Sequence, residues 1–185
     1  REAVEAALPG ARAHTLPLRP LERFAALWPR VVTLARDQAL HAVVVGGDRT
    51  AVELALAVAG ALGRAPCRPG SHVSLVSGGV PLPAGWPPAG QQRVSQLLRQ
   101  RGVSVLPQVC TGFSAGQVHL AGGARLACDV PLLAAPEQPP AWLAASGLAL
   151  DAQGQVQVNE RRQSTSHPAV FASGAGTDRD ADAAL

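Results

Sequence analysis

The sequence has 185 residues, 47% apolar and 16% charged, which fits one domain with room for a smaller appendage and is too apolar for a disordered chain. No apolar run reaches the roughly 20 residues of a membrane span, and three cysteines without a Cys-x-x-Cys spacing exclude a disulfide framework, a zinc ribbon and a dithiol redox pair. The net charge is only +3, and the 16 cationic residues, all arginine, neither cluster nor alternate with aromatic residues, so nucleic-acid binding is not expected.

The first 40 residues are predicted to be a lead-in segment with one helix. Residues 16–20 contain two prolines, which bias the residues before them toward extended backbone. Over residues 21–39 the apolar side chains recur with a spacing near 3.6, which is the pattern of an amphipathic helix.

Residues 41–135 alternate apolar strands with helices. Three consecutive valines at 43–45 lead into two glycines, as in a parallel strand that is covered on both faces. Strands alternating with helices predict right-handed crossovers and a parallel sheet. The predicted strands are 41–47, 72–77, 103–106 and 129–135, the predicted helices are 50–63 and 91–101, and residues 78–90 form a Gly- and Pro-rich loop.

Three short segments at 108–111, 117–120 and 125–127 are separated by glycine and predict an antiparallel meander beside the parallel sheet. The predicted fold class is therefore α/β: a Rossmann-like parallel sheet flanked by helices on both faces, with a small antiparallel β-meander. Residues 136–185 are predicted to be a C-terminal flank with a short helix at 141–146, two short strands at 155–158 and 170–172, and an acidic tail.

The turn after the first strand is the most informative segment, because a strand, a glycine turn and a helix form the setting of the dinucleotide fingerprint Gly-x-Gly-x-x-Gly/Ala. Gly46 takes its first position, Gly47 follows, and Ala51 takes the third. The second position is Asp48, where glycine is expected. This carboxylate can cap the helix, a contribution of about 1 kcal/mol, and a purely structural cap is as plausible as a functional role.

A pyrophosphate bound at this turn would face the charge of Asp48. At about 4 Å two like charges repel by about 1 kcal/mol in water and roughly 4 kcal/mol at an effective dielectric of 20. Since about 1.4 kcal/mol is a tenfold change in affinity, dinucleotide binding would weaken by tens to hundreds of times. The second strand ends at Ser77, where a carboxylate for the ribose hydroxyls is expected, and no Asp or Glu occurs between Glu53 and Asp129. Ser77 can still offer one weaker hydrogen bond.

Several stretches resemble the pyridine nucleotide-disulfide oxidoreductase superfamily, and more narrowly the type II NADH dehydrogenase-like flavoproteins. Residues 43–55 are similar to their V-V-G-G-G-x-x-G-V-E-L-A, and residues 128–136 resemble their A-D-x-V-x-x-A-T-G. Residues 16–24 are similar to their entry into the NAD-binding domain. Residues 147–172 match G-L and R-S-T-S-H-P-x-V-F-A, which is the most specific similarity.

The resemblance implies an NAD(P)-binding-like Rossmann domain with meander over residues 41–135 and a C-terminal flank that leads back toward an FAD domain. NAD(H) and FAD are the implied cofactors, with the FAD-binding portion of the parent chain as a partner. Implied cofactor contacts are Gly46, Gly47, Asp48, Ala51, Glu53, Ser77, Ala135 and Gly174. Four positions depart from the family pattern, namely Asp48, Ser77, Pro136 and Ala175.

The implied function is the NAD(P)H-binding domain of an FAD-dependent NADH dehydrogenase-like oxidoreductase, in which a hydride passes from nicotinamide to flavin. This portion alone is not expected to carry out the chemistry. The alternative is a diverged Rossmann-like domain that no longer binds a dinucleotide and acts as a scaffold or interaction module. Because the sequence begins with Arg1 and shows no charged-then-apolar leader, we expect a mature or excised piece of a cytoplasmic protein, with a peripheral membrane position left open.

The remaining candidate residues are Glu53, the cysteines and the histidines, and a structural role is considered for each of them. Glu53 either approaches the nicotinamide side of the site or favours the helix dipole as an acid of the first turn. The three cysteines are expected to be small core or loop residues without a redox role. The histidines have no carboxylate or thiol at ligand spacing, so no metal site is expected.

Overall fold

The computed structural model describes residues 8–16, 18, 20–64, 67–134, 139, 141–173 and 177. The chain divides into two compact units, Arg1–Pro136 and Glu137–Leu185, and each is described by itself. The boundary predicted between residues 40 and 41 stays a prediction. Among the described residues, no helix has the length and apolar character that crossing a membrane requires.

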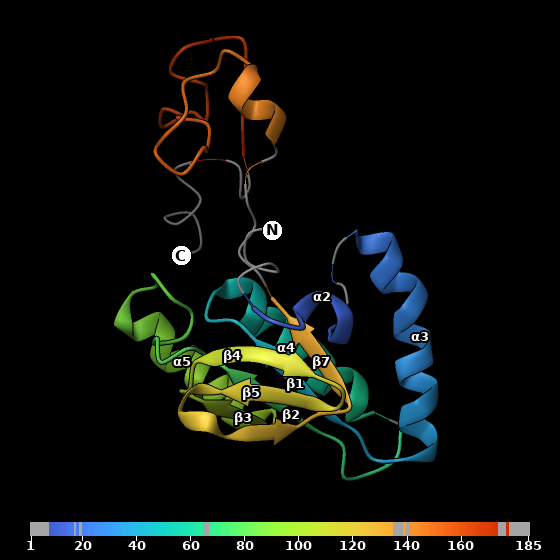
Figure 1. The fold of residues 1–185 in the computed structure, drawn as a ribbon. Helices are drawn as coiled ribbons and strands as arrows, with labels where there is room; N and C mark the ends of the chain where they lie inside the picture. Colours follow the sequence, from blue (N-terminus) through green and yellow to red (C-terminus); the bar gives the residue numbers. More distant parts are fainter. Residues whose placement is uncertain are drawn as a thin grey trace. The chain divides into compact units, whose positions relative to one another are not determined.

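A four-stranded parallel sheet lies at the centre of the first unit (Figure 1). Its strands are β1 (His41–Val45), β2 (His72–Val76), β3 (Val103–Leu106) and β7 (Val130–Leu133), in the order β3-β2-β1-β7. The parallel sheet predicted from the sequence is confirmed. The order reverses at β1, since β2 and β3 lie on one side of it and β7 lies on the other.

Three helices pack on one face of this sheet: α3 (Leu21–Asp37), α4 (Arg49–Leu62) and α5 (Pro88–Gln100). Helix α4 ends where predicted, at Gly63, whose N–H donates to the carbonyl of Ala59. Helix α5 begins three residues before the predicted start. The reason is Pro88 in its first turn, where the ring presets the helical φ and the missing N–H costs no helical hydrogen bond.

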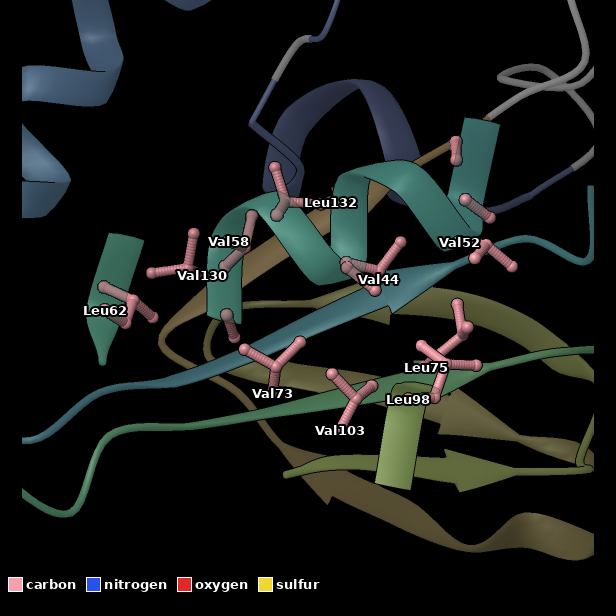
Figure 2. Close-up of a cluster of buried hydrophobic side chains, with 14 of the residues drawn as sticks. Val44, Val52, Val58, Leu62, Val73, Leu75, Leu98, Val103, Val130 and Leu132 are labelled. Atoms are coloured by element: carbon pink, nitrogen blue, oxygen red, sulfur yellow. The ribbon is translucent and has the colours of Figure 1, made fainter. Parts of the chain in front are cut away.

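The core between the sheet and these helices is built from aliphatic side chains. Val44, Leu75 and Leu132 of the strands are fully buried, and Figure 2 shows Leu75 next to Leu98 of α5. Helix α3 joins the same core through Ala35, although its segment was predicted as a lead-in. Further members of this core are Ala42, Ala51, Val52, Ala55, Val58, Leu62, Val73, Leu98, Val103 and Val130.

The other face of the parallel sheet is covered by a separate antiparallel sheet of β4 (Cys110–Ser114), β5 (Gln117–Leu120) and β6 (Arg125–Ala127). The predicted meander is therefore confirmed, but it packs on the parallel sheet rather than extending it. Val43, Val45 and Val76 meet Phe113 and Val118 there. The only helix that shares this second core among the described residues is the four-residue α2 (Ala11–His14), so the long helices lie on one face, not on both.

Strand β4 is longer than predicted at its end. The prediction stopped at residue 111, before Gly112, because an internal glycine favours a break in a strand. The strand instead continues to Ser114, with a bulge between Cys110 and Gly112, and a two-residue turn then leads into β5.

The second unit is built mainly from turns around a small cluster of Leu143, Val156 and Val158. Its one described helix is the 3₁₀ helix η2 (Ala141–Ala145), close to the predicted helix. The two strands predicted near the C-terminus are only isolated bridges, in which Val158 pairs with Ser164 and Gln163 pairs with Phe171. With so few partners, these segments form no continuous hydrogen-bonded ladder.

Replacing Leu98 by alanine should destabilise the protein by about 2–5 kcal/mol, because it removes a fully buried helical side chain and leaves a cavity. Leu34→Ala is the matched control, since Leu34 also lies in a helix but is 43% exposed. Leu34→Ala should lower the free energy of unfolding by no more than about 0.5 kcal/mol. Urea unfolding of both variants measures the difference, and equal losses would contradict the assignment of Leu98 to the core.

Candidate functional site

The glycine turn from Gly46 to Asp48 lies at the carboxyl end of β1, between β1 and the first turn of α4. The Gly46 N–H donates to the carbonyl of Val76 at 3.0 Å, and the Ala134 N–H donates to the carbonyl of Val45 at 2.9 Å. The turn therefore sits where the ends of β2, β1 and β7 meet. In open α/β sheets, the reversal of strand order leaves a crevice at this edge, and ligands bind there.

Gly46 and Ala51 are brought together as the fingerprint requires. Gly46 has a φ of 153°, and a Cβ atom built on it would lie 2.8 Å from the Ala134 carbonyl oxygen and 2.9 Å from the Ala51 Cβ. Ala51 is itself completely buried. Any side chain at residue 46 would thus separate the start of α4 from β7, and only a small residue fits at position 51.

Gly47 contacts the loop that follows β2. A Cβ atom on Gly47 would lie 2.5 Å from Val80 Cγ2 and 2.8 Å from the carbonyl oxygen of Ser77. The Ala84 N–H also donates to the carbonyl of Gly47 at 2.8 Å. The Gly- and Pro-rich loop of residues 78–90, which was predicted only to be irregular, therefore packs directly against the glycine turn. Its Leu82 side chain is buried.

Asp48 caps α4, as predicted from the sequence. Its Oδ1 accepts a hydrogen bond from the Ala51 N–H at 2.9 Å. A helix N-terminus attracts an anion because its first N–H groups are free and its dipole is positive there. The carboxylate of Asp48 already occupies one of the N–H groups that could otherwise bind an anion. The charge of Asp48 would oppose a second anion at this helix end. A pyrophosphate contact of Gly46 and Gly47 stays a prediction.

Ser77 lies at the end of β2, beside the turn, and is only 4% exposed. Its N–H donates to the carbonyl of Leu106 at 3.0 Å, which continues the pairing of β2 with β3. The structure thus brings Ser77 close to Gly47. No acid occurs in residues 54–128, so this edge of the sheet has no carboxylate from that stretch. A role for Ser77 in holding a ribose stays a prediction.

Glu53 lies on the exposed side of α4. Its Oε1 is 2.7 Å from Nε of Arg49, one helical turn earlier, and the two side chains are 62% and 61% exposed. Such an exposed pair contributes at most about 0.5 kcal/mol to the helix. The expected contact of Glu53 with nicotinamide stays a prediction. Ala135 and Gly174, and the divergent Pro136 and Ala175, lie outside the described residues.

The cysteines and histidines lie at several separate places in the first unit and the C-terminal unit. Cys110 and Cys128 are buried, and burial raises the pKa of both thiols, that of Cys128 to about 12. His41 stacks on His72 at the start of β1 and β2, opposite the glycine turn. Burial lowers the pKa of His41, and so does the neighbouring His72. Within the described ranges, no three His, Cys, Asp or Glu side chains are placed to hold a metal ion.

Thiol labelling of the native protein at pH 8 should modify Cys67 rapidly and the other two cysteines slowly. The thiolate is the reactive form, and Cys110 and Cys128 are both buried and kept protonated by their raised pKa values. Counting the thiols that react with a chromogenic disulfide, before and after denaturation, measures this. In the control variant Cys67→Ser, rapid labelling of the native protein would show that a buried cysteine is accessible.

Gly47→Ala should destabilise the first unit by about 1–3 kcal/mol, because the added methyl group meets both Val80 and backbone. Gly60→Ala makes the same chemical change inside α4, where an added Cβ meets nothing within 4 Å. The free energy of unfolding of that variant should increase by about 0.5–1 kcal/mol, because alanine has a higher helix propensity than glycine. Opposite shifts of the thermal unfolding midpoint are expected, and a stable Gly47→Ala protein would mean that the loop does not pack on the turn.

Comparison with known proteins gives a family match across nearly the whole chain. The family model described as pyridine nucleotide-disulphide oxidoreductase matches residues 6–183. No curated protein sequence matches the chain.

Solved structures share the fold at low sequence identity. Reduced CoADR-RHD from Bacillus anthracis is 21% identical, with a TM-score of 0.65, over 92% of this chain and 30% of its own. The water-forming NADH oxidase of Lactobacillus brevis, solved bound to NADH, is 18% identical with a TM-score of 0.65, over 92% of this chain and 36% of its own. A ferredoxin reductase from Rhodopseudomonas palustris is 21% identical with a TM-score of 0.64, over 92% of this chain and 40% of its own. The chain therefore spans less than half of the length of each of these structures. Because the family model covers residues 6–183, the chain belongs to the pyridine nucleotide-disulphide oxidoreductase family.

Proposed function

We propose that this chain is the NAD(P)H-binding portion of an FAD-dependent, NADH dehydrogenase-like oxidoreductase. The observation that carries the proposal is the glycine turn, which lies where the strand order reverses and opens directly into α4. Family membership and the fold shared with an NADH oxidase solved with NADH bound support it. The activity of the whole protein, and a cytoplasmic location, belong to the same proposal.

The proposed roles of the site residues follow from where they lie. Gly46 and Gly47 admit the pyrophosphate to the backbone, and the N-terminus of α4 stabilises its charge. In this proposal Ser77 offers a neutral hydrogen-bonding group to the ribose, and Glu53, one turn into α4, approaches the nicotinamide. When bound, the nicotinamide supplies the hydride that reduces the flavin held by the rest of the protein.

A diverged domain without dinucleotide binding is the second candidate function, and the hydrogen bond from the Ala51 N–H to Asp48 favours it. A pyrophosphate would have to share the helix N-terminus with this carboxylate. Residues 54–128, which include Ser77, contain no Asp or Glu, and this removes a further expected contact. In this alternative the chain keeps the scaffold of the family and acts as an interaction module.

Calorimetric titration with NADH and NADPH distinguishes the two functions. Asp48→Gly should increase dinucleotide affinity about tenfold or more, because it removes a like-charge repulsion that reaches roughly 4 kcal/mol at an effective dielectric of 20. The loss of the cap costs only a few tenths of a kcal/mol when glycine replaces an N-cap residue. Asp48→Asn keeps a capping side chain without the charge and should show a similar gain.

Asp37→Asn is the matched control, because it removes one acid at the end of α3, away from the turn. It should leave the affinity unchanged. A tenfold gain confined to the two Asp48 variants would support the proposed function. Binding that stays millimolar or absent in all of them would favour the scaffold alternative.

A further inference from the structure

A pocket of about 270 Å³ opens on the antiparallel sheet, separate from the glycine turn. It is formed where β5 passes through the short 3₁₀ turn η1 (Ala121–Gly123) into β6. The proposed dinucleotide site uses none of the residues that line it. Its polar side chains are those of Thr111, His119 and Arg125.

The strand register brings these three side chains together. His119 of β5 is paired with Arg125 of β6 on one side and with Gly112 of β4 on the other. Residues directly opposite each other in an antiparallel pair have neighbouring side chains, about 5 Å apart at Cβ. Thr111 lies in the bulge next to Gly112. An arginine, an imidazole and a hydroxyl therefore converge from three strands.

Hydrogen bonds hold the walls of this pocket in place. The Leu120 N–H donates to the carbonyl of Ala124 at 2.9 Å, and the Ala121 N–H donates to the carbonyl of Val109 at 2.8 Å. The imidazole Nε2 of His119 lies 2.8 Å from Oγ of Ser114, which fixes the orientation of the ring. A rigid arrangement of this kind loses little conformational entropy when a ligand binds.

Arg125 is the one Arg, Asp or Glu side chain among the residues that line the pocket. The stretch of sequence that supplies the lining, residues 54–128, contains no Asp or Glu. Among the described residues, no carboxylate forms an ion pair with Arg125, which is exposed on the rim. The guanidinium group presents a planar set of donors that matches an oxyanion, and a histidine or threonine beside it adds further donors.

We propose that this pocket is a binding site for the phosphate group of a small molecule. Arg125 supplies the positive charge and a bidentate pair of donors, Thr111 supplies a hydroxyl donor, and His119 supplies the ring between them. Gly122 and Gly123, which carry no side chains, leave the approach from η1 open. This site is independent of the proposed dinucleotide function, because no residue is shared.

Inorganic phosphate is the probe for this site. Heteronuclear NMR at constant pH should show phosphate shifting the resonances of His119, Gly122 and Gly123, relative to sodium chloride at equal ionic strength. Arg125→Gln should weaken binding at least about tenfold, since it removes the guanidinium charge that contacts the anion. The phosphate affinity of Arg125→Lys should lie between those of the unchanged protein and Arg125→Gln, because lysine keeps the charge but not the planar pair of donors.

Arg101→Gln is the matched control, because it removes an exposed arginine from the same acid-free stretch outside the pocket lining. It should bind phosphate as the unchanged protein does. Equal weakening in both glutamine variants would show that phosphate responds only to overall charge, and would overturn the proposal. An absence of shifts beyond those of chloride would overturn it as well. Neither result depends on whether the glycine turn binds a dinucleotide.

Discussion

The rest of the structure depends on β1, whose side chains alternate between two separate hydrophobic cores. Ala42 and Val44 pack under the helices, and Val43 and Val45 pack under the antiparallel sheet. Burying a valine side chain contributes about 1.5–3 kcal/mol, so this strand is held strongly from both faces. A shift of one residue in its register would exchange the two faces, which fixes where the strand ends and the turn begins.

The site at the end of β1 combines two requirements that oppose each other. Close packing between α4, the end of β7 and the loop after β2 requires glycine at positions 46 and 47, and the proposed function requires the same two residues to let a pyrophosphate approach the backbone. Asp48 then stabilises the helix by satisfying the Ala51 N–H, but its charge opposes an anion at the same helix end. The family scaffold is thus kept together with a carboxylate at the helix end where the family pattern has glycine.

Much of the fold could be predicted because its signals are local. The apolar runs of β1, β2 and β3 and the periodicity of α3 and α4 need only neighbouring residues to be recognised. The differences have physical causes of longer range. Strand β4 continues through Gly112 because β5 pairs with it, and the segments near Val158 form only isolated bridges because they have few partners.

The glycine turn, the cap at Asp48 and the absence of acids in residues 54–128 can all be recognised in the sequence, since they depend on residues within a few positions of one another or on composition. In contrast, the packing of the loop around Val80 and Ala84 on Gly47, and the position of His119 between Arg125 and Gly112, follow only from the folded chain. Those contacts join residues that are brought together by crossovers and strand register. Such pairings are set by how whole elements bury their apolar faces, which no local pattern specifies.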